Sequence, residues 1–144
     1  MKVSTILTVA FASAASAVHY GIYSVKEEGW LVQYPNNNFL GFDATTIRPT
    51  KWTILNQNND GDVYFQSVAT DDFINCDVPP ICSRDKQPVV YTMEGAKEDG
   101  TELPDDTYFV RDAQGDCVWT AYDNAMVCGE ATDAENQQFR IIEI

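Results

Sequence analysis

Histidine, the commonest acid–base residue of enzymes, is scarce in this chain. His19 is the only histidine, and it stands near the start of the sequence, where chains are commonly mobile. A serine or cysteine nucleophile needs a histidine held beside it as a base. Acidic pairs are frequent, but none lies in an apolar stretch that would raise a carboxyl pKa into the range of acid–base catalysis. We therefore expect a protein that is not an enzyme and uses no cofactor.

Metal binding has equally little support. The spacings of the four cysteines do not match those of a zinc site, and the chain has only one histidine to add as a ligand. The run Asn56, Asn58, Asp60 and Gly61 resembles the start of a calcium loop, but Ser67 stands where a bidentate glutamate is needed. An Asn-Asp-Gly hairpin turn accounts for the same residues. We expect no metal site.

The first residues have the three parts of a secretory signal peptide. Lys2 is the positive start, residues 6–11 are apolar, and Ala15-Ser16-Ala17 is a small-residue cleavage site. The apolar stretch is too short to cross a bilayer as a helix. We expect residues 1–17 to be removed and residues 18–144 to form one secreted, extracellular domain.

The four cysteines fit an extracellular protein. Cys76, Cys82, Cys117 and Cys128 allow three disulfide connectivities. The first two flank a tight turn, and the last two flank a hairpin with Asp123-Asn124 at its tip. Because paired strands would bring each couple face to face, we predict the disulfides Cys76–Cys82 and Cys117–Cys128.

The charge balance limits the partners of this chain. It has 22 Asp and Glu against 9 Lys and Arg, a net charge of −13. Such a chain repels phosphates, so we expect neither nucleic acid nor membrane as a partner. We expect the protein to be a monomer.

The elements that must position any site follow a repeat. Tyr20, Tyr64 and Tyr108 stand 44 residues apart, and each opens an alternating strand pattern. Each segment closes on another aromatic strand, around Trp52, Tyr91 and Phe139. Twelve short strands are predicted, at 19–25, 30–34, 39–43, 51–56, 62–68, 73–77, 81–85, 89–94, 107–112, 117–122, 126–130 and 138–143. No sustained helical period follows residue 18.

Three units of four strands predict an all-β β-trefoil, with six strands in a barrel and six in hairpins that close one end. A long charged loop, 95–106, would separate the second unit from the third. The predicted core consists of alternating residues: Tyr20, Ile22, Leu31, Leu40, Trp52, Ile54, Tyr64, Val90, Tyr108, Val110, Val118, Val127, Phe139 and Ile141.

The strand openings, such as Tyr20-Gly21-Ile22-Tyr23-Ser24, and the closing Gln137-Gln138-Phe139 resemble β-trefoil proteins. Two branches suit a small secreted chain. One contains protease inhibitors, the Kunitz soybean-type inhibitors and the fungal mycocypins. The other contains the ricin-B-type lectins.

The resemblance to mycocypins implies reversible inhibition of papain-like cysteine proteases by two loops wedged into the active-site cleft. The corresponding segments are Lys26-Glu27-Glu28-Gly29 and Thr46-Ile47-Arg48-Pro49. The Kunitz-type reactive loop would be 57–61, which has no basic residue for a trypsin-like target. The main hypothesis is a secreted fungal effector that inhibits a host or competitor protease, in the plant apoplast if the host is a plant.

The alternative is a carbohydrate-binding lectin. Ricin-B-type repeats close on Gln-x-Trp, and only Gln137-Gln138-Phe139 comes close to it here. The segment between Cys117 and Cys128 resembles the disulfide hairpin of those repeats, with Trp119 and Tyr122 as candidate sugar-stacking residues. A glycan is the partner that this reading implies.

Overall fold

The computed structural model describes residues 18–34, 36–56, 61–76, 81–98, 100–114 and 117–144. The predicted signal peptide and most of the Kunitz-type loop, residues 57–60, lie outside them. Among the described residues, no helix is long and apolar enough to cross a membrane.

Six strands form a closed barrel. They are β1 (Tyr20–Ser24), β4 (Trp52–Asn56), β5 (Asp62–Ser67), β8 (Tyr91–Gly95), β11 (Thr107–Asp112) and β14 (Phe139–Glu143). Each pairs with the next in this order, and β14 returns to pair with β1, so the ring has no free edge.

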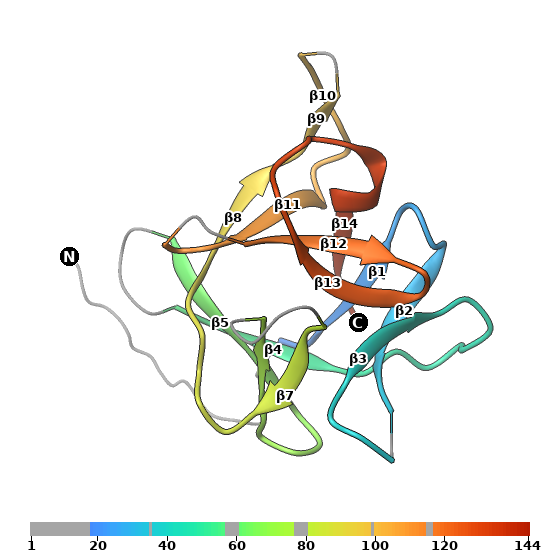
Figure 1. The fold of residues 1–144 in the computed structure, drawn as a ribbon, viewed down its shortest axis with the longest axis vertical. Helices are drawn as coiled ribbons and strands as arrows, with labels where there is room; N and C mark the ends of the chain where they lie inside the picture. Colours follow the sequence, from blue (N-terminus) through green and yellow to red (C-terminus); the bar gives the residue numbers. More distant parts are fainter. Residues whose placement is uncertain (1–17, 35, 57–60, 77–80, 99, 115–116) are drawn as a thin grey trace.

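Three hairpins form the other half of the fold. They are β2 (Gly29–Gln33) with β3 (Leu40–Asp43), β6 (Phe73–Asn75) with β7 (Ser83–Asp85), and β12 (Val118–Tyr122) with β13 (Ala125–Gly129). Single bridges join each hairpin to the other two: Gly41 with Ala125, Phe39 with Ser83, and Ile81 with Val127. We call this joined surface the cap; in Figure 1 it lies in front of the barrel. The β-trefoil prediction is confirmed.

The three closing aromatics were correctly predicted to be core residues. Trp52, Tyr91 and Phe139 begin β4, β8 and β14 and have no solvent exposure. Trp119 lies among them, with its ring 5.2 Å from Tyr91 and 6.0 Å from Phe139. Burying an aromatic side chain contributes about 1.5–3 kcal/mol, so this group accounts for much of the core stability.

The register of the second repeat differs from the prediction by one residue. The closing aromatics pair with Tyr20, Val63 and Tyr108, so Val63 and not Tyr64 is the equivalent of the other two tyrosines. Because side chains alternate along a strand, Val63 and Phe65 face the core while Tyr64 packs outside against Phe73. The same reason puts other core residues one place from those predicted: Val89 and Tyr91 are buried in place of Val90, and Met126 in place of Val127.

The predicted loop at 95–106 contains a small hairpin. Strands β9 (Lys97–Glu98) and β10 (Thr101–Glu102) project from one edge of the molecule (Figure 1). A short 3₁₀ helix, η3 (Glu135–Gln137), precedes β14. The hairpin is additional to the twelve strands of the threefold plan.

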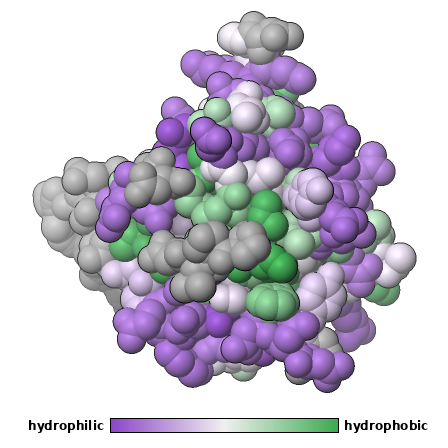
Figure 2. Space-filling view, in the orientation of Figure 1, coloured by the Kyte–Doolittle hydropathy of each residue, from purple (hydrophilic) through white to green (hydrophobic). Residues whose placement is uncertain are grey.

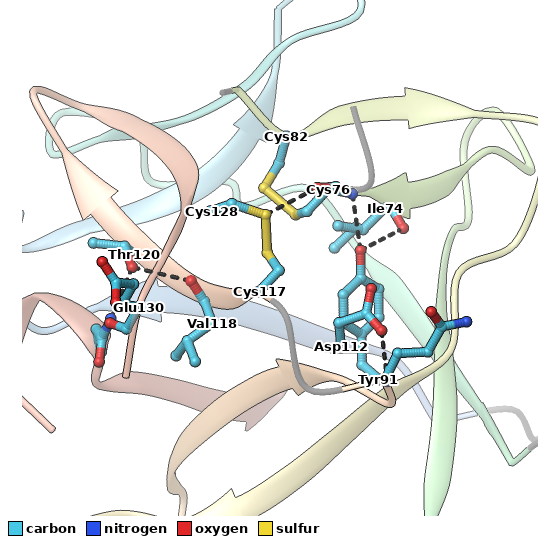
Figure 3. The surroundings of a disulfide bond; sticks show 12 residues. Ile74, Cys76, Cys82, Tyr91, Asp112, Cys117, Val118, Thr120, Cys128 and Glu130 are labelled. Atoms are coloured by element: carbon cyan, nitrogen blue, oxygen red, sulfur yellow. Dashed lines mark hydrogen bonds between the residues drawn. A yellow bond between two sulfur atoms is a disulfide. The ribbon is translucent and has the colours of Figure 1, made fainter. Parts of the chain in front are cut away.

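Both predicted disulfides are present, Cys76–Cys82 and Cys117–Cys128. They lie next to each other, with the Cys128 sulfur 2.9 Å from the Cys76 carbonyl oxygen (Figure 3). The buried Tyr91 hydroxyl donates to the Ile74 carbonyl at 3.2 Å and accepts from the Cys76 amide at 3.0 Å. Each disulfide therefore closes one cap hairpin, and the Tyr91 bonds fix the β6–β7 hairpin to the core.

Candidate functional site

The two segments predicted to bind a protease lie together. A Cβ atom on Gly29 would stand 2.8 Å from the backbone of both Asp43 and Ala44, so the 25–28 turn approaches the start of the 44–51 connection closely. Only glycine fits there, because the nearby atoms are backbone atoms that cannot move aside. Gly29 therefore has a packing role that the sequence did not reveal.

The turn that contains Lys26, Glu27 and Glu28 is ordered by its own hydrogen bonds. The Glu27 amide donates to the Ser24 hydroxyl at 3.0 Å, and the Glu28 amide donates to the Ser24 carbonyl at 2.9 Å. The Glu27 carboxylate then accepts from the Asn124 amide at 3.2 Å. This bond turns Glu27 toward the tip of the β12–β13 hairpin, while Lys26 and Glu28 stay exposed.

The second predicted segment presents an apolar apex. Ile47 is 89% exposed, although its loop is ordered on both sides. Asp43 accepts from the Thr45 amide at 2.8 Å and from its hydroxyl at 2.6 Å, and these bonds lower the Asp43 pKa. The Thr46 hydroxyl makes hydrogen bonds to the backbone of Arg48, and Pro49 packs near Gly21.

The cap has the exposed aromatic side chains. Among the described residues, Tyr34, Phe39 and Tyr122 are the only aromatics of this kind, at 37%, 46% and 69% exposure, and all three lie in or beside cap strands. Figure 2, which looks onto this face, shows apolar residues gathered near its centre within a polar surround. The sequence pointed to Tyr122 alone. Trp119, the other predicted sugar-stacking residue, is wrong for that role because it is buried in the core.

Two of these aromatics, Tyr34 and Tyr122, flank a surface of small residues. Tyr122 pairs with Ala125, Ala125 pairs with Gly41, and a Cβ on Gly41 would lie 2.7 Å from the Tyr34 ring. Tyr34 therefore lies over Gly41. Since adjacent strands are ~4.8 Å apart, Tyr122 and Gly41 are separated by roughly 10 Å. We call this surface, together with Glu27 and Asn124, the cap site.

The sequence offered a weak signal for Tyr34 and Phe39. Both flank the polar stretch 35–38, between β2 and β3, where aromatic residues have no core to fill. Large aromatics beside a turn are candidates for binding. The alternation of side chains along a strand could not show, however, that Tyr34 packs over Gly41 of β3.

Gln137 has a structural role. Its carbonyl oxygen accepts from the Thr132 amide at 2.9 Å, and its amide nitrogen donates to the Glu130 carbonyl at 2.7 Å and to the Thr120 hydroxyl at 3.0 Å. At 2% exposure it fastens the 130–138 connection to β12. The Gln137-Gln138-Phe139 signature therefore marks the fold, because internal hydrogen bonds occupy the polar atoms of the Gln137 side chain.

A second concave surface lies beneath the β9–β10 hairpin. This groove of about 1000 Å³ is lined mainly by polar residues, among them Glu94, Glu102 and Asp133, with Phe109 nearly buried at 6% exposure. Arg111 and Glu94 at its side form an ion pair at 3.0 Å. The groove offers no exposed aromatic face, unlike the cap site.

The fold and site define a β-trefoil protein with an aromatic cap surface. No protein-family model matches the sequence, and a search of curated proteins found no match. Solved structures do match. A GlcNAcα1-4Gal-releasing endo-β-galactosidase from Clostridium perfringens is similar over 88% of this chain, with a TM-score of 0.70 and 14% identity. The chain covers only 32% of that enzyme.

Two further similar structures have about the size of this chain. The designed threefold-symmetric protein ThreeFoil matches with a TM-score of 0.64 and 10% identity, over 88% of this chain and 99% of its own. SeviL, solved bound to asialo-GM1 saccharide, matches with a TM-score of 0.68 and 11% identity, over 88% and 98%. At these identities, the likeness establishes the fold alone.

Proposed function

We propose that this protein binds carbohydrate through the cap site. The observation that carries the proposal is that all the exposed aromatics in the part of the chain that the structure describes gather on the cap: Tyr34, Phe39 and Tyr122. Similar structures support it, since SeviL was solved with a bound saccharide and the endo-galactosidase acts on a glycan. The lectin alternative is thus favoured over protease inhibition.

The chemistry of the cap site suits a sugar. The apolar C–H face of a sugar ring packs against an aromatic ring, and the tyrosine hydroxyls remain free to bond at the rim. The Glu27 carboxylate retains acceptor capacity beside its bond from Asn124, so it can receive sugar hydroxyls. Binding is reversible and involves no covalent step, in keeping with a protein that is not an enzyme.

Removing the most exposed ring tests this proposal. Tyr122→Ala should weaken the binding of a glycan identified on an array by about tenfold, because truncating a central aromatic anchor costs roughly 1.4 kcal/mol or more. Titration calorimetry measures the loss. Ile144→Ala is the matched control, since Ile144 is 46% exposed at the far end of β14, away from the cap. Unchanged affinity in Tyr122→Ala, or no glycan bound by the parent protein, would refute the cap site.

A second function, inhibition of a papain-like cysteine protease, is favoured by a different observation. Ile47 is 89% exposed at the apex of an ordered loop that packs beside the Lys26–Gly29 turn. Ordered loops lose little entropy on binding, and an exposed isoleucine can fill an apolar subsite. In this proposal, the protein is a secreted fungal effector acting on a protease of a host, in the plant apoplast, or of a competitor.

Ile47→Asp tests this second function. It should raise the inhibition constant against papain by at least about tenfold, because a carboxylate would have to enter an apolar subsite. The melting temperature should not change, since Ile47 makes few contacts. Gly29 is unsuitable for this test, because any side chain there would collide with the 43–44 backbone and disturb folding. Full activity of papain at micromolar concentrations of the parent protein would exclude the target class.

A further inference from the structure

Resting on the proposed carbohydrate binding, we propose that the cap site selects uncharged glycans and rejects those with sialic acid, sulfate or uronate groups near the tyrosines. The basis is a carboxylate that the fold holds beside the site. Glu27 comes from the β1–β2 turn, yet its side chain accepts from the Asn124 amide at 3.2 Å, at the tip of the hairpin that carries Tyr122. A ligand stacked on Tyr122 therefore lies next to a fixed negative charge.

The backbone at both ends of this contact is held in place. The Glu27 amide is bonded to the buried Ser24 hydroxyl, and the following residue has a left-handed backbone, with φ of 55° at Glu28. The other end of the contact is equally constrained, because Asp123 and Asn124 form a tight turn with φ of 51° and 63°. The Asn124 carbonyl also accepts from the Phe42 amide at 2.8 Å, which ties the hairpin tip to β3.

The surrounding charges reinforce Glu27. Glu28 and Asp123 are exposed and acidic, and Lys26 is the one basic residue in the turn. Among the described residues, no ion pair joins Lys26 to these carboxylates. The whole chain adds a net charge of −13. An anionic ligand would thus meet several like charges beside Tyr122. Arg84, which hydrogen-bonds to Asn37 and Asn38 between Tyr34 and Phe39, is itself paired with Asp72 at 3.7 Å.

The size of the effect follows from Coulomb's law. One like charge at an assumed separation of ~7 Å weakens binding about threefold at the dielectric constant of water, and by more than about tenfold at that of a protein surface. With further carboxylates nearby, we expect at least about tenfold preference for the neutral member of a glycan pair at low salt. Salt shortens the range of this repulsion, so the preference should narrow near 1 M NaCl, where the Debye length is about 3 Å.

The test uses an array of matched neutral, sialylated and sulfated glycans, probed with the intact protein at low and high salt. At low salt, we expect each neutral glycan to be bound at least about tenfold more strongly than its sialylated or sulfated counterpart. In Glu27→Gln, the ratio of anionic to neutral binding should rise severalfold. Glu143→Gln, which removes the same charge from the exposed end of β14, should leave that ratio unchanged.

The outcomes separate this inference from the function on which it rests. Equal or stronger binding of the anionic members, or a ratio that Glu27→Gln does not change, overturns the charge selectivity while carbohydrate binding stands. If no glycan of any charge is bound, the proposed function itself fails, and the selectivity fails with it.

Discussion

At the scale of residues, this protein separates side chains that fix the structure from those available to a partner. Gly29 was a candidate for binding in the sequence and Gln137 part of a lectin-like signature, yet each is buried and holds a connection in place. Ile47 and Tyr122 are highly exposed, although the elements that carry them are ordered. A large apolar side chain left exposed on an ordered element is the stronger indication of binding, because the folded chain gains nothing from it.

The ion pair between Asp106 and Arg140 leads to a pH-dependent prediction. Arg140 contacts the carboxylate with two nitrogens, at 2.8 Å and 3.1 Å, and its hydrogen bond lowers the pKa of Asp106. Because the pKa of Asp106 is lower in the folded state, the carboxylate adds stability at pH values above 3.8, the usual pKa of an aspartate. That stability is lost as the pH falls through the lowered pKa. Asp106→Asn should therefore reduce the free energy of unfolding near neutral pH by about 0.5–1 kcal/mol, a small value because solvent screens the pair.

Urea unfolding at neutral and strongly acidic pH measures this effect. The difference in unfolding free energy between Asp106→Asn and the parent protein should vanish at the acidic pH. There the parent carboxyl is protonated and therefore as uncharged as the asparagine amide. Asp105→Asn is the control, since Asp105 is exposed and forms no ion pair among the described residues. A gap of the same size at both pH values would show that the loss does not come from the carboxylate charge.

At the scale of elements, the barrel and the cap pack into one hydrophobic core, and disulfides also close two of the three cap hairpins. The β6–β7 hairpin has only three residues in each strand, which is too short to be stable alone. It is closed by Cys76–Cys82 and bridged to its neighbours at Ile81 and Ser83. Short hairpins can therefore present surface residues on the cap without a thick core of their own.

The disulfide of the β12–β13 hairpin should contribute measurably to stability. Cys117 and Cys128 are separated by 11 positions, and closing a loop of that size stabilises a fold by about 3 kcal/mol through the unfolded chain. The double variant Cys117→Ala with Cys128→Ala should lose about that amount in urea unfolding. The variant Cys76→Ala with Cys82→Ala is the comparison, and its shorter loop predicts a slightly smaller loss. A loss below about 0.5 kcal/mol in the first variant would mean that the cap holds together without its cross-link.

At the scale of the whole molecule, the sequence predicted the architecture better than the site. The repeat, the twelve strands and both disulfides could be read from it because periodic aromatics, turn residues and cysteine spacing are local signals. The one-residue shift at Val63 could not, since it depends on which residue pairs with Tyr91 across the barrel. The cap site was missed for a similar reason: Tyr34, Gly41 and Asn124 meet only after two hairpins have packed together.

Barrel closure also brings the two ends of the domain together, which permits a test of the threefold plan. The Ile144 amide donates to the His19 carbonyl at 2.9 Å, and the β1–β14 ladder continues from there. A circular permutant that joins residue 144 to residue 18 through a short glycine linker, with new ends at Gly100 and Thr101, keeps every barrel pairing. The break falls in the β9–β10 hairpin, which lies outside the threefold plan, and exposed turns of this kind tolerate new termini.

We expect this permutant to fold with the same far-ultraviolet circular dichroism spectrum and to keep the glycan affinity of the parent domain. A permutant opened inside β5, between Tyr64 and Phe65, is the matched control and should not fold, because that break interrupts the β4–β5 ladder. If the permutant opened at Gly100 also failed to fold, the β9–β10 hairpin would be a required part of the barrel and not an addition to the threefold plan.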